Sequence, residues 1–324
     1  MEKIIERAKE LYGLTGTDLK RIRSHEGGRN TVFAGGGYVL RVSCLSDRTM
    51  NDYLAETEFI RYLAENGAPV ADVICSISGN TVERVDSDGT TFYLCLFEYA
   101  KGMLIADNGY RYREGVPLEE YFYNTGKALG AIHRLSKSYC PRAKRRDQSE
   151  LFNEQYIDTL IPDSYRDLKD AIGKRLQRFA DLPKEIGDYG LVHFDFSDGN
   201  YHVDLSSGDI TVFDFDNCLY CWYMFDLAHL WTHGTGWYQF ESDPEARKKG
   251  MDHYFATVLE GYRSETDVSE EMLDNLQLFI DMTIIEYVID EFQCSIREGE
   301  LPDPEDIEHA YNVLIHDIPF AGFF

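Results

Sequence analysis

The sequence LVHFDFSDGN occupies residues 191–200, where an apolar run passes into a polar loop that contains Asp195 and ends at Asn200. A predicted hairpin follows, and Asp214 comes after a second apolar run, fourteen residues beyond Asn200. A strand that ends at one Asp, followed by a hairpin that returns with another, can bring two carboxylates and an amide oxygen to a common point. Such hard oxygen donors suit Mg²⁺, which proteins bind through one or two carboxylates together with substrate phosphates.

These three side chains match the division of labour in phosphoryl transfer, where catalysis is mostly positioning and neutralisation of charge. Asp195 would orient an acceptor hydroxyl and take its proton, while Asn200 and Asp214 would hold the metal ion. Asp and Asn are also common turn formers, so a purely structural loop is the alternative.

The apolar pattern indicates a small β-rich part followed by a larger helical part, with the joint near residues 98–103. In the first part we expect helices over 2–12 and 49–66, and strands over 19–26, 31–33, 38–43, 81–86 and 91–99. In the second part we expect helices over 118–137, 149–160, 164–181, 222–233, 244–264, 269–296 and 303–315, and a hairpin that pairs 201–203 with 210–215.

The charge of the chain is strongly negative. Its 324 residues include 57 acidic and 32 basic side chains, which gives a formal charge of −25. Such a surface repels nucleic acid and anionic lipid, so we expect neither nucleic acid nor membrane as a partner, whereas a cationic ligand would be attracted. The acidity is equally explained as the solubilising surface of a cytoplasmic protein.

Two further features favour the cytoplasm. The first residues, MEKIIER, lack the apolar core of a signal peptide, and no apolar run approaches the roughly 18 residues of a membrane span. The seven cysteines are scattered and odd in number, which favours reduced thiols. Cys218 and Cys221 form a single CxxC, and without a second pair we expect them in the core rather than on zinc.

The motif His193-x-Asp195-x-x-x-x-Asn200, followed by Asp214 and by Asp226-Leu-Ala, resembles the aminoglycoside phosphotransferase and choline kinase family. The resemblance runs through nearly the whole chain in order. It implies that Asp195 is the catalytic base, that Asn200 and Asp214 are Mg²⁺ ligands, and that His193 supports the loop.

The same resemblance implies an α+β, bilobed protein-kinase-like fold. The nucleotide-binding lobe would comprise residues 1–100, and the catalytic and acceptor-binding lobe would comprise residues 101–324. ATP and Mg²⁺ are the implied cofactors, and a small molecule with a hydroxyl group is the implied acceptor.

The resemblance also assigns nucleotide contacts in the first lobe. A glycine-rich turn with Gly28 and Asn30 lies where the family covers the ATP phosphates. Arg41 occupies the strand position of the phosphate-binding Lys of kinases, and it keeps a permanent cation and adds a bidentate fork. Glu56, rather than Glu58, has the family's spacing for an ion pair with that cation. A plain hairpin and solvent-facing side chains are the alternatives.

The segment 92–102 resembles the family's hinge between lobes. The Glu98 carbonyl and the Ala100 amide are the implied adenine contacts, and Phe97 would back the adenine pocket. An ordinary buried strand is the alternative.

Three further polar residues, Asp216, Asp226 and His133, are expected to have supporting roles. Asp216 either takes part in the metal's outer surroundings or caps a turn. Asp226 is expected to cap the helix that follows it, which is a structural role. His133 is expected to be a packed core histidine.

The acceptor site is expected among the helices after Asp226. His229 and the aromatic residues Trp231 and Tyr238 lie close together in the sequence, and Glu286 and Asp290 share one face of a later helix. Aromatic rings and carboxylates would suit an amine-bearing alcohol. These residues would otherwise belong to the core and to a solvated helix face.

We therefore expect an ATP- and Mg²⁺-dependent phosphotransferase that acts on a small molecule, with a cationic amino alcohol, aminoglycoside-like or choline-like compound as acceptor. Two alternatives remain. One is a Ser/Thr protein kinase of the same fold, which the short interval between Asp214 and Asp226 disfavours. The other is a nucleotide-binding scaffold without catalysis, for which Arg41 is the only hint.

Overall fold

The computed structural model describes residues 1–22, 30–44, 48–320 and 322, and these form two compact units. Unit 1 comprises Met1–Arg111, Ser138–Arg145 and Asn200–Asp216. Unit 2 comprises Tyr112–Lys137, Arg146–Gly199 and Asn217–Phe324. The chain therefore passes from unit 2 to unit 1 between Gly199 and Asn200, and it returns to unit 2 after Asp216.

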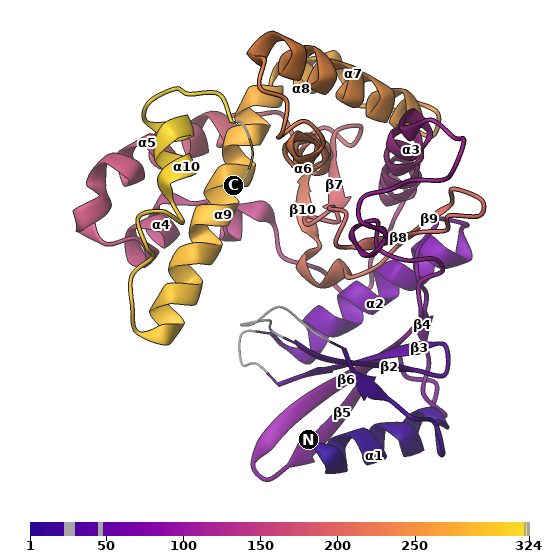
Figure 1. Ribbon diagram of the computed structural model, residues 1–324. Helices are drawn as coiled ribbons and strands as arrows, with labels where there is room; N and C mark the ends of the chain where they lie inside the picture. Colours follow the sequence, from indigo (N-terminus) through magenta and orange to yellow (C-terminus); the bar gives the residue numbers. More distant parts are fainter. Residues whose placement is uncertain (23–29, 45–47, 321, 323–324) are drawn as a thin grey trace. The chain divides into compact units, whose positions relative to one another are not determined.

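Unit 1 is built on an antiparallel sheet with the strand order β1-β2-β3-β6-β4, and β5 pairs with β6 (Figure 1). Its elements are α1 (Glu2–Tyr12), β1 (Lys20–Arg21), β2 (Asn30–Gly35), β3 (Tyr38–Ser43), α2 (Met50–Glu65), β4 (Val73–Ile74), β5 (Glu83–Ser87), β6 (Thr90–Glu98), and the hairpin of β8 (Tyr201–Val203) with β9 (Ile210–Val212).

Alternate residues of β6 separate the two faces of this sheet. Leu94 and Leu96 belong to the core cluster that also includes residues of α1. Cys95 belongs to a second cluster with Tyr53 of α2, and Phe97 packs against that cluster. Because successive side chains of a strand point to opposite faces, α1 covers one face and α2 the other, as Figure 1 shows. The α2 face is the one that presents Arg41 and Glu56 to each other.

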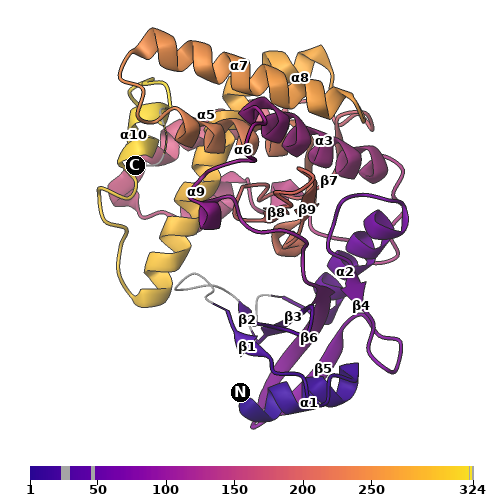
Figure 2. The same cartoon turned by 45° about the vertical axis from the view of Figure 1, so that its right-hand side comes forward.

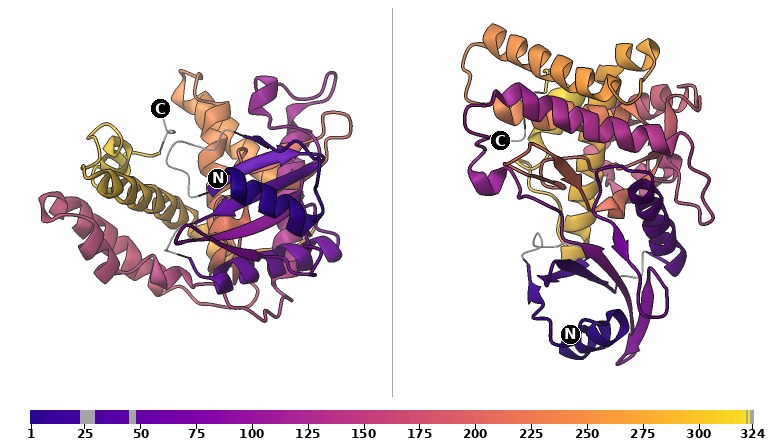
Figure 3. Two further views of the ribbon diagram at one scale, coloured as in Figure 1. Left: turned by 90° about the horizontal axis from the view of Figure 1, so that it is seen from below. Right: turned by 90° about the vertical axis from the view of Figure 1, so that its right-hand side faces the viewer.

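Unit 2 is mainly helical and contains one two-stranded sheet, β7 with β10. Its elements are α3 (Leu118–Ser136), α4 (Glu154–Leu160), α5 (Arg166–Ala180), β7 (Tyr189–Val192), β10 (Leu219–Trp222), α6 (Met224–Gly234), α7 (Pro244–Arg263), α8 (Glu270–Asp274), α9 (Leu276–Glu298) and α10 (Glu308–Leu314). Helix α9 packs against α6 and α5, and its course beside α5 is visible in Figure 3.

Helices α3 and α7 approach each other closely because glycines line their contact (Figure 2). A Cβ atom on Gly126 would lie 1.9 Å from the carbonyl oxygen of Val258, and one on Gly261 would lie 1.9 Å from that of Tyr123. Only glycine permits this backbone-to-backbone approach.

Most expected elements are confirmed. Helix α1 and strand β3 have the predicted bounds, and the hairpin of β8 and β9 is present. The predicted single helix over 269–296 is wrong, because it is interrupted at Asn275, whose side chain donates to the Glu271 carbonyl (2.8 Å) and competes with the backbone. The last helix is shorter than predicted, and β4 and β10 were not predicted.

The CxxC pair lies in the core as expected: Cys218 and Cys221 are fully buried free thiols. Among the helices of the described residues, none combines the length and the apolar character that crossing a membrane requires.

Replacing Gly126 by Ala should destabilise the protein by about 1–3 kcal/mol, because the new methyl group overlaps the α7 backbone. The free energy of unfolding in urea measures this effect. Gly173→Ala in α5 is the matched control, since its Cβ would meet only Glu154 Oε1 at 3.9 Å. That control should stabilise by about 0.5–1 kcal/mol. Equal effects of the two substitutions would contradict the close packing of α3 on α7.

Candidate active site

The loop that carries Asp195 is held by the buried carboxylate of Asp226. Its Oδ2 accepts the backbone N–H of His193 and its Oδ1 accepts that of Phe194, both at 2.8 Å. Oδ2 also lies 3.1 Å from Nε2 of His133. Both oxygens are therefore used, and the backbone that precedes Asp195 is fixed from within unit 2.

Asp226 does not cap its own helix, so that expectation is wrong. Helix α6 begins after Tyr223 and has no side-chain cap. Burial opposes ionisation of Asp226, but the hydrogen bond and charge of His133 outweigh it, and the pKa of Asp226 is lowered overall. His133 is confirmed as a core histidine, since its other nitrogen, Nδ1, lies 3.0 Å from the Tyr262 hydroxyl.

The backbone around Asp195 has an unusual conformation. Phe194 adopts φ +72°, which is rare for a bulky residue, and its ring stacks on Phe225 with centroids 4.5 Å apart. His193 is fully buried, and its Nδ1 accepts the Asp195 N–H at 3.4 Å. Asp195 itself is half-buried. Strain of this kind is typical of functional loops that the surrounding structure holds in place.

In unit 1, Arg41 forms a bidentate ion pair with Glu56. Nη1–Oε1 and Nη2–Oε2 distances are 2.8 and 2.7 Å, and both side chains are buried. The Arg41 guanidinium also lies 5.1 Å from the ring centroid of Phe97. Burial disfavours the cation, but the charge of Glu56 outweighs it and raises the pKa of Arg41. The structure thus brings together these three predicted residues.

Asp214 and Asn200 are neighbours in unit 1, because the Phe213 N–H donates to the Asn200 carbonyl (2.9 Å). Asp214 Oδ1 lies 3.9 Å from Arg41 Nη1. Protein atoms crowded around Asp214, and then the charge of Asp216, raise the pKa of Asp214 to about 6, although Arg41 opposes the shift. Since 51% of the Asp214 side chain is open to solvent, water screens part of this repulsion.

Asp216 connects several parts of unit 1. Its Oδ1 is 2.8 Å from Arg48 Nη1, its Oδ2 accepts from Asn30 Nδ2 at 3.0 Å, and its carbonyl accepts from Arg145 at 2.7 Å. The structure places Asp216 in a buried ion pair with Arg48, and its part in the outer surroundings of a metal ion stays a prediction. The Asn30 amide is used here and by Ser43, which donates to its oxygen.

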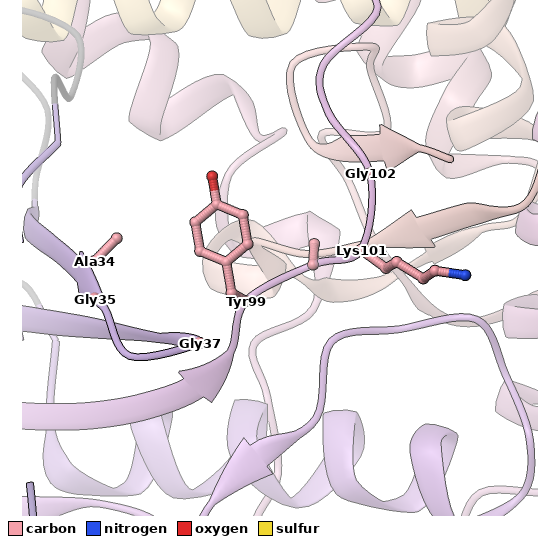
Figure 4. Close-up of a pocket in the computed structure, with 7 residues that line it drawn as sticks. Ala34, Gly35, Gly37, Tyr99, Lys101 and Gly102 are labelled. Atoms are coloured by element: carbon pink, nitrogen blue, oxygen red, sulfur yellow. The ribbon is translucent and has the colours of Figure 1, made fainter. Parts of the chain in front are cut away.

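Ala100 lines a pocket of about 550 Å³ within unit 1, and Glu98 directly precedes the lining residue Tyr99 (Figure 4). The pocket is lined by Ala34, Gly35, Gly37, Tyr99, Ala100, Lys101 and Gly102. The Glu98 N–H donates to the Asp72 carbonyl (2.9 Å), whereas the Ala100 N–H has no partner among the described residues. In Figure 4 the Tyr99 ring stands in the pocket, while Lys101 runs away from Ala34 toward its ion-pair partner Asp204.

The other predicted residues are less closely grouped. Gly28 lies outside the described residues. Trp231 is half-buried on α6, and the Tyr238 ring packs against Gly250 of α7, where an added Cβ would come within 2.3 Å. On α9, Glu286 is half-buried and Asp290 is exposed.

Arg48 and Arg145 were not anticipated. Both cations act on Asp216 from distant parts of the sequence, and the local pattern around each arginine carries no signal for this contact.

The comparisons with known proteins agree with this fold. The phosphotransferase enzyme family matches residues 18–266. Amicoumacin kinase of Bacillus subtilis (strain 168) is 28% identical over 284 residues, which is 84% of this chain and 79% of that protein.

Among solved structures, the amicoumacin kinase hAmiN in complex with AMP-PNP, Ca²⁺ and Ami superposes with a TM-score of 0.81 at 24% identity, covering 100% of this chain and 95% of that one. A microcompartment-associated aminopropanol kinase superposes with a TM-score of 0.70 at 18% identity, and the match covers 98% of each chain. A choline/ethanolamine kinase family protein from Mesorhizobium loti superposes with a TM-score of 0.61 at 15% identity, and the match covers 96% of this chain and 92% of that one.

The chain belongs to the phosphotransferase enzyme family, which confirms the resemblance drawn from its motif. The α+β protein-kinase-like fold is confirmed as well. The protein is an enzyme of the small-molecule kinase type. Asn200 is hydrogen-bonded to Phe213, the residue before Asp214, within unit 1, whereas Asp195 belongs to unit 2, so a joint site of the three residues stays a prediction.

Asp226→Asn should lower the free energy of unfolding by about 3 kcal/mol at pH 7, since an amide cannot accept both backbone N–H groups. The folded-state pKa of Asp226 is lowered, so its stabilisation is present above the ordinary Asp pKa of about 4 and is lost as the pH falls. Urea unfolding at pH 7 and at about pH 2.5 should show the difference from wild type shrinking. A difference of the same size at both pH values would contradict the assignment.

Arg41→Met should cost about 3–5 kcal/mol, because Glu56 stays buried without its cation. The double variant Arg41→Met/Glu56→Met should recover most of that loss in urea unfolding. The control Lys248→Met removes an exposed pair with Asp252 and should change stability by less than about 1 kcal/mol. A double variant as unstable as the single one would show that the two side chains are not coupled.

Proposed function

We propose that the protein transfers the γ-phosphoryl group of ATP to a hydroxyl group of a small amine-bearing molecule, with Mg²⁺. The observation that carries this proposal is the arrangement in unit 1 of a buried Arg41–Glu56 pair beside Asp214. In phosphoryl transfer a cation and a metal-binding carboxylate are needed at the nucleotide phosphates. The named kinases among the relatives support a small molecule as acceptor.

The residues present fit a divalent cation. Loss of solvation and then the negative charge of Asp216 raise the pKa of Asp214, and a bound cation would favour its carboxylate and offset the charge of Asp216. Asp214 and Asn200 would hold Mg²⁺ together with nucleotide phosphates. Mg²⁺ supplies neutralisation of phosphate charge.

The nucleotide would bind in unit 1. Ala100 lines the pocket at the predicted hinge, and its N–H, which has no partner among the described residues, would donate to a ring nitrogen of adenine, with the Glu98 carbonyl as acceptor for the amino group. Arg41 would neutralise the phosphates, and Phe97 would back the base. Gly28 and Asn30 remain proposed contacts of the phosphate-covering turn.

Asp195 would act as the base in unit 2. The acceptor oxygen attacks the γ-phosphorus as its proton passes to the Asp195 carboxylate, and the bond to the bridging oxygen breaks to release ADP. Asp226 and His193 position this loop. Trp231, Tyr238, Glu286 and Asp290 are proposed acceptor contacts, and the lobes are proposed to comprise residues 1–100 and 101–324.

A protein kinase would need a docking segment for a peptide between Asp214 and Asp226. That interval is described throughout, and it is occupied by β10 (Leu219–Trp222), which pairs with β7 and is mostly buried. A small molecule is therefore the better acceptor. Labelled ATP incubated with a cell lysate tests the alternative, since labelled protein bands would favour a protein kinase.

Asp195→Asn should lower kcat about 10²–10⁴-fold with little change in nucleotide affinity, because only the proton acceptor is lost. ADP formation with Mg²⁺ and amicoumacin, aminopropanol, choline or ethanolamine measures the rate. Asp209→Asn, at an exposed carboxylate of the β8–β9 hairpin, is the control and should behave as wild type. Wild-type kcat in Asp195→Asn would refute its role, and ATP binding without turnover of any acceptor would favour the scaffold.

A further inference from the structure

His229 is a buried histidine whose ring is left without hydrogen bonds. It lies on α6, one turn after Asp226, and is 7% exposed. Both Nδ1 and Nε2 are buried and have no partner in the described part of the chain. By contrast, His133 uses both of its nitrogens, and His193 uses Nδ1. The same unit thus satisfies two buried histidines and leaves the third unsatisfied.

This arrangement is costly unless a ligand completes it. A buried donor or acceptor without a partner destabilises a fold by about 1–3 kcal/mol. The Phe225 ring, centred 5.0 Å from the imidazole, can receive a weak N–H contact but cannot serve the lone pair of the other nitrogen. A phenylalanine at position 229 would fill similar space without that cost.

The position of His229 connects it with the predicted catalytic loop. Its ring lies 6.5 Å from that of Phe194, the residue before Asp195. On the next turn of α6 the His233 ring lies 6.2 Å away and nearly parallel, and His233 is exposed. His229 is therefore one layer below the surface of unit 2, beside the loop that presents Asp195.

The imidazole is neutral at physiological pH. Burial and then the neighbouring His233 lower the pKa of His229 to about 3. A neutral ring offers one N–H and one lone pair, and a hydroxyl group can pair with either. An ammonium group could use only the lone pair, and surroundings that suppress an imidazolium also disfavour an ammonium.

We propose that His229 is a specificity-determining residue that hydrogen-bonds a second hydroxyl of the acceptor, distinct from the hydroxyl that is phosphorylated. This inference rests on the proposed function, in which Asp195 serves the reacting hydroxyl. It predicts that the preferred acceptors are polyhydroxylated amines rather than simple amino alcohols.

The test compares aminopropanediol with aminopropanol, two amines that differ by one hydroxyl, in wild type and in His229→Phe. In wild type kcat/KM should favour the diol by about 10-fold, the effect of one hydrogen bond to a buried group. In His229→Phe this preference should disappear while kcat/KM for aminopropanol stays within about threefold. His309→Phe is the matched control, because its half-buried ring packs edge-on against Tyr287.

The melting temperature of the protein without ligands gives a second readout. Because His229→Phe removes unsatisfied polar atoms, it should melt at the same temperature as wild type or higher. A lower melting temperature with an unchanged preference for the diol would identify a structural or water-bonded histidine and overturn the proposal. An unchanged preference alone would also overturn it.

If wild type phosphorylates neither compound, the proposed function is judged by the other acceptors, and binding decides the inference. Imidazole ¹⁵N shifts are then measured with aminopropanediol in the presence of Mg²⁺ and AMP-PNP, and His229 is assigned by its loss in His229→Phe. A shift of the His229 nitrogens with the diol, larger than with aminopropanol, supports recognition of the second hydroxyl. Absence of that shift overturns the proposal.

Discussion

The hydrogen bonds from the His193 and Phe194 backbone to the carboxylate of Asp226 are the contacts on which the active loop depends. A charged acceptor inside an apolar core is expensive to bury unless its lone pairs are used, and here the loop and His133 use them. The same contacts hold Phe194 in a left-handed conformation that a bulky residue avoids. The conformation of the Asp195 loop therefore depends on the buried charge of Asp226 and on the core packing around it.

In unit 1 the charged side chains differ in whether they have a close partner of opposite charge, and this distinguishes structural ion pairs from Asp214. Arg41 is paired with Glu56, and Arg48 is paired with Asp216, so these charges stabilise the local fold. Among the described residues the cation paired with Asp214 is Arg41, at the longer distance of 3.9 Å, and the pKa of Asp214 stays raised. Because Arg41 and Arg48 are paired with Glu56 and Asp216, they leave the negative charge of Asp214 incompletely neutralised. A carboxylate in this state is suited to binding a metal ion.

Polar groups without partners give a second indication of where ligands bind. The fold satisfies the buried His133, yet it leaves the Ala100 N–H and the His229 ring unpaired among the described residues. One of these groups lies at the pocket of unit 1, and the other lies beside the loop of unit 2. Unsatisfied groups of this kind lower stability, so their presence is better explained by recognition than by packing.

Local patterns were enough to identify the loop with Asp195 and strand β3, because motif spacing and apolar periodicity depend on neighbouring residues. The pairing of Arg41 with Glu56 was implied by the family resemblance, and the structure confirms it. Local patterns also assigned Asp226 to its own helix and joined α8 to α9. Contacts across long intervals of sequence, such as Asp226 with His193 or Arg145 with Asp216, arise only when the chain packs. Burial and hydrogen-bond partners, and hence charge state, follow from that packing, which no local pattern encodes.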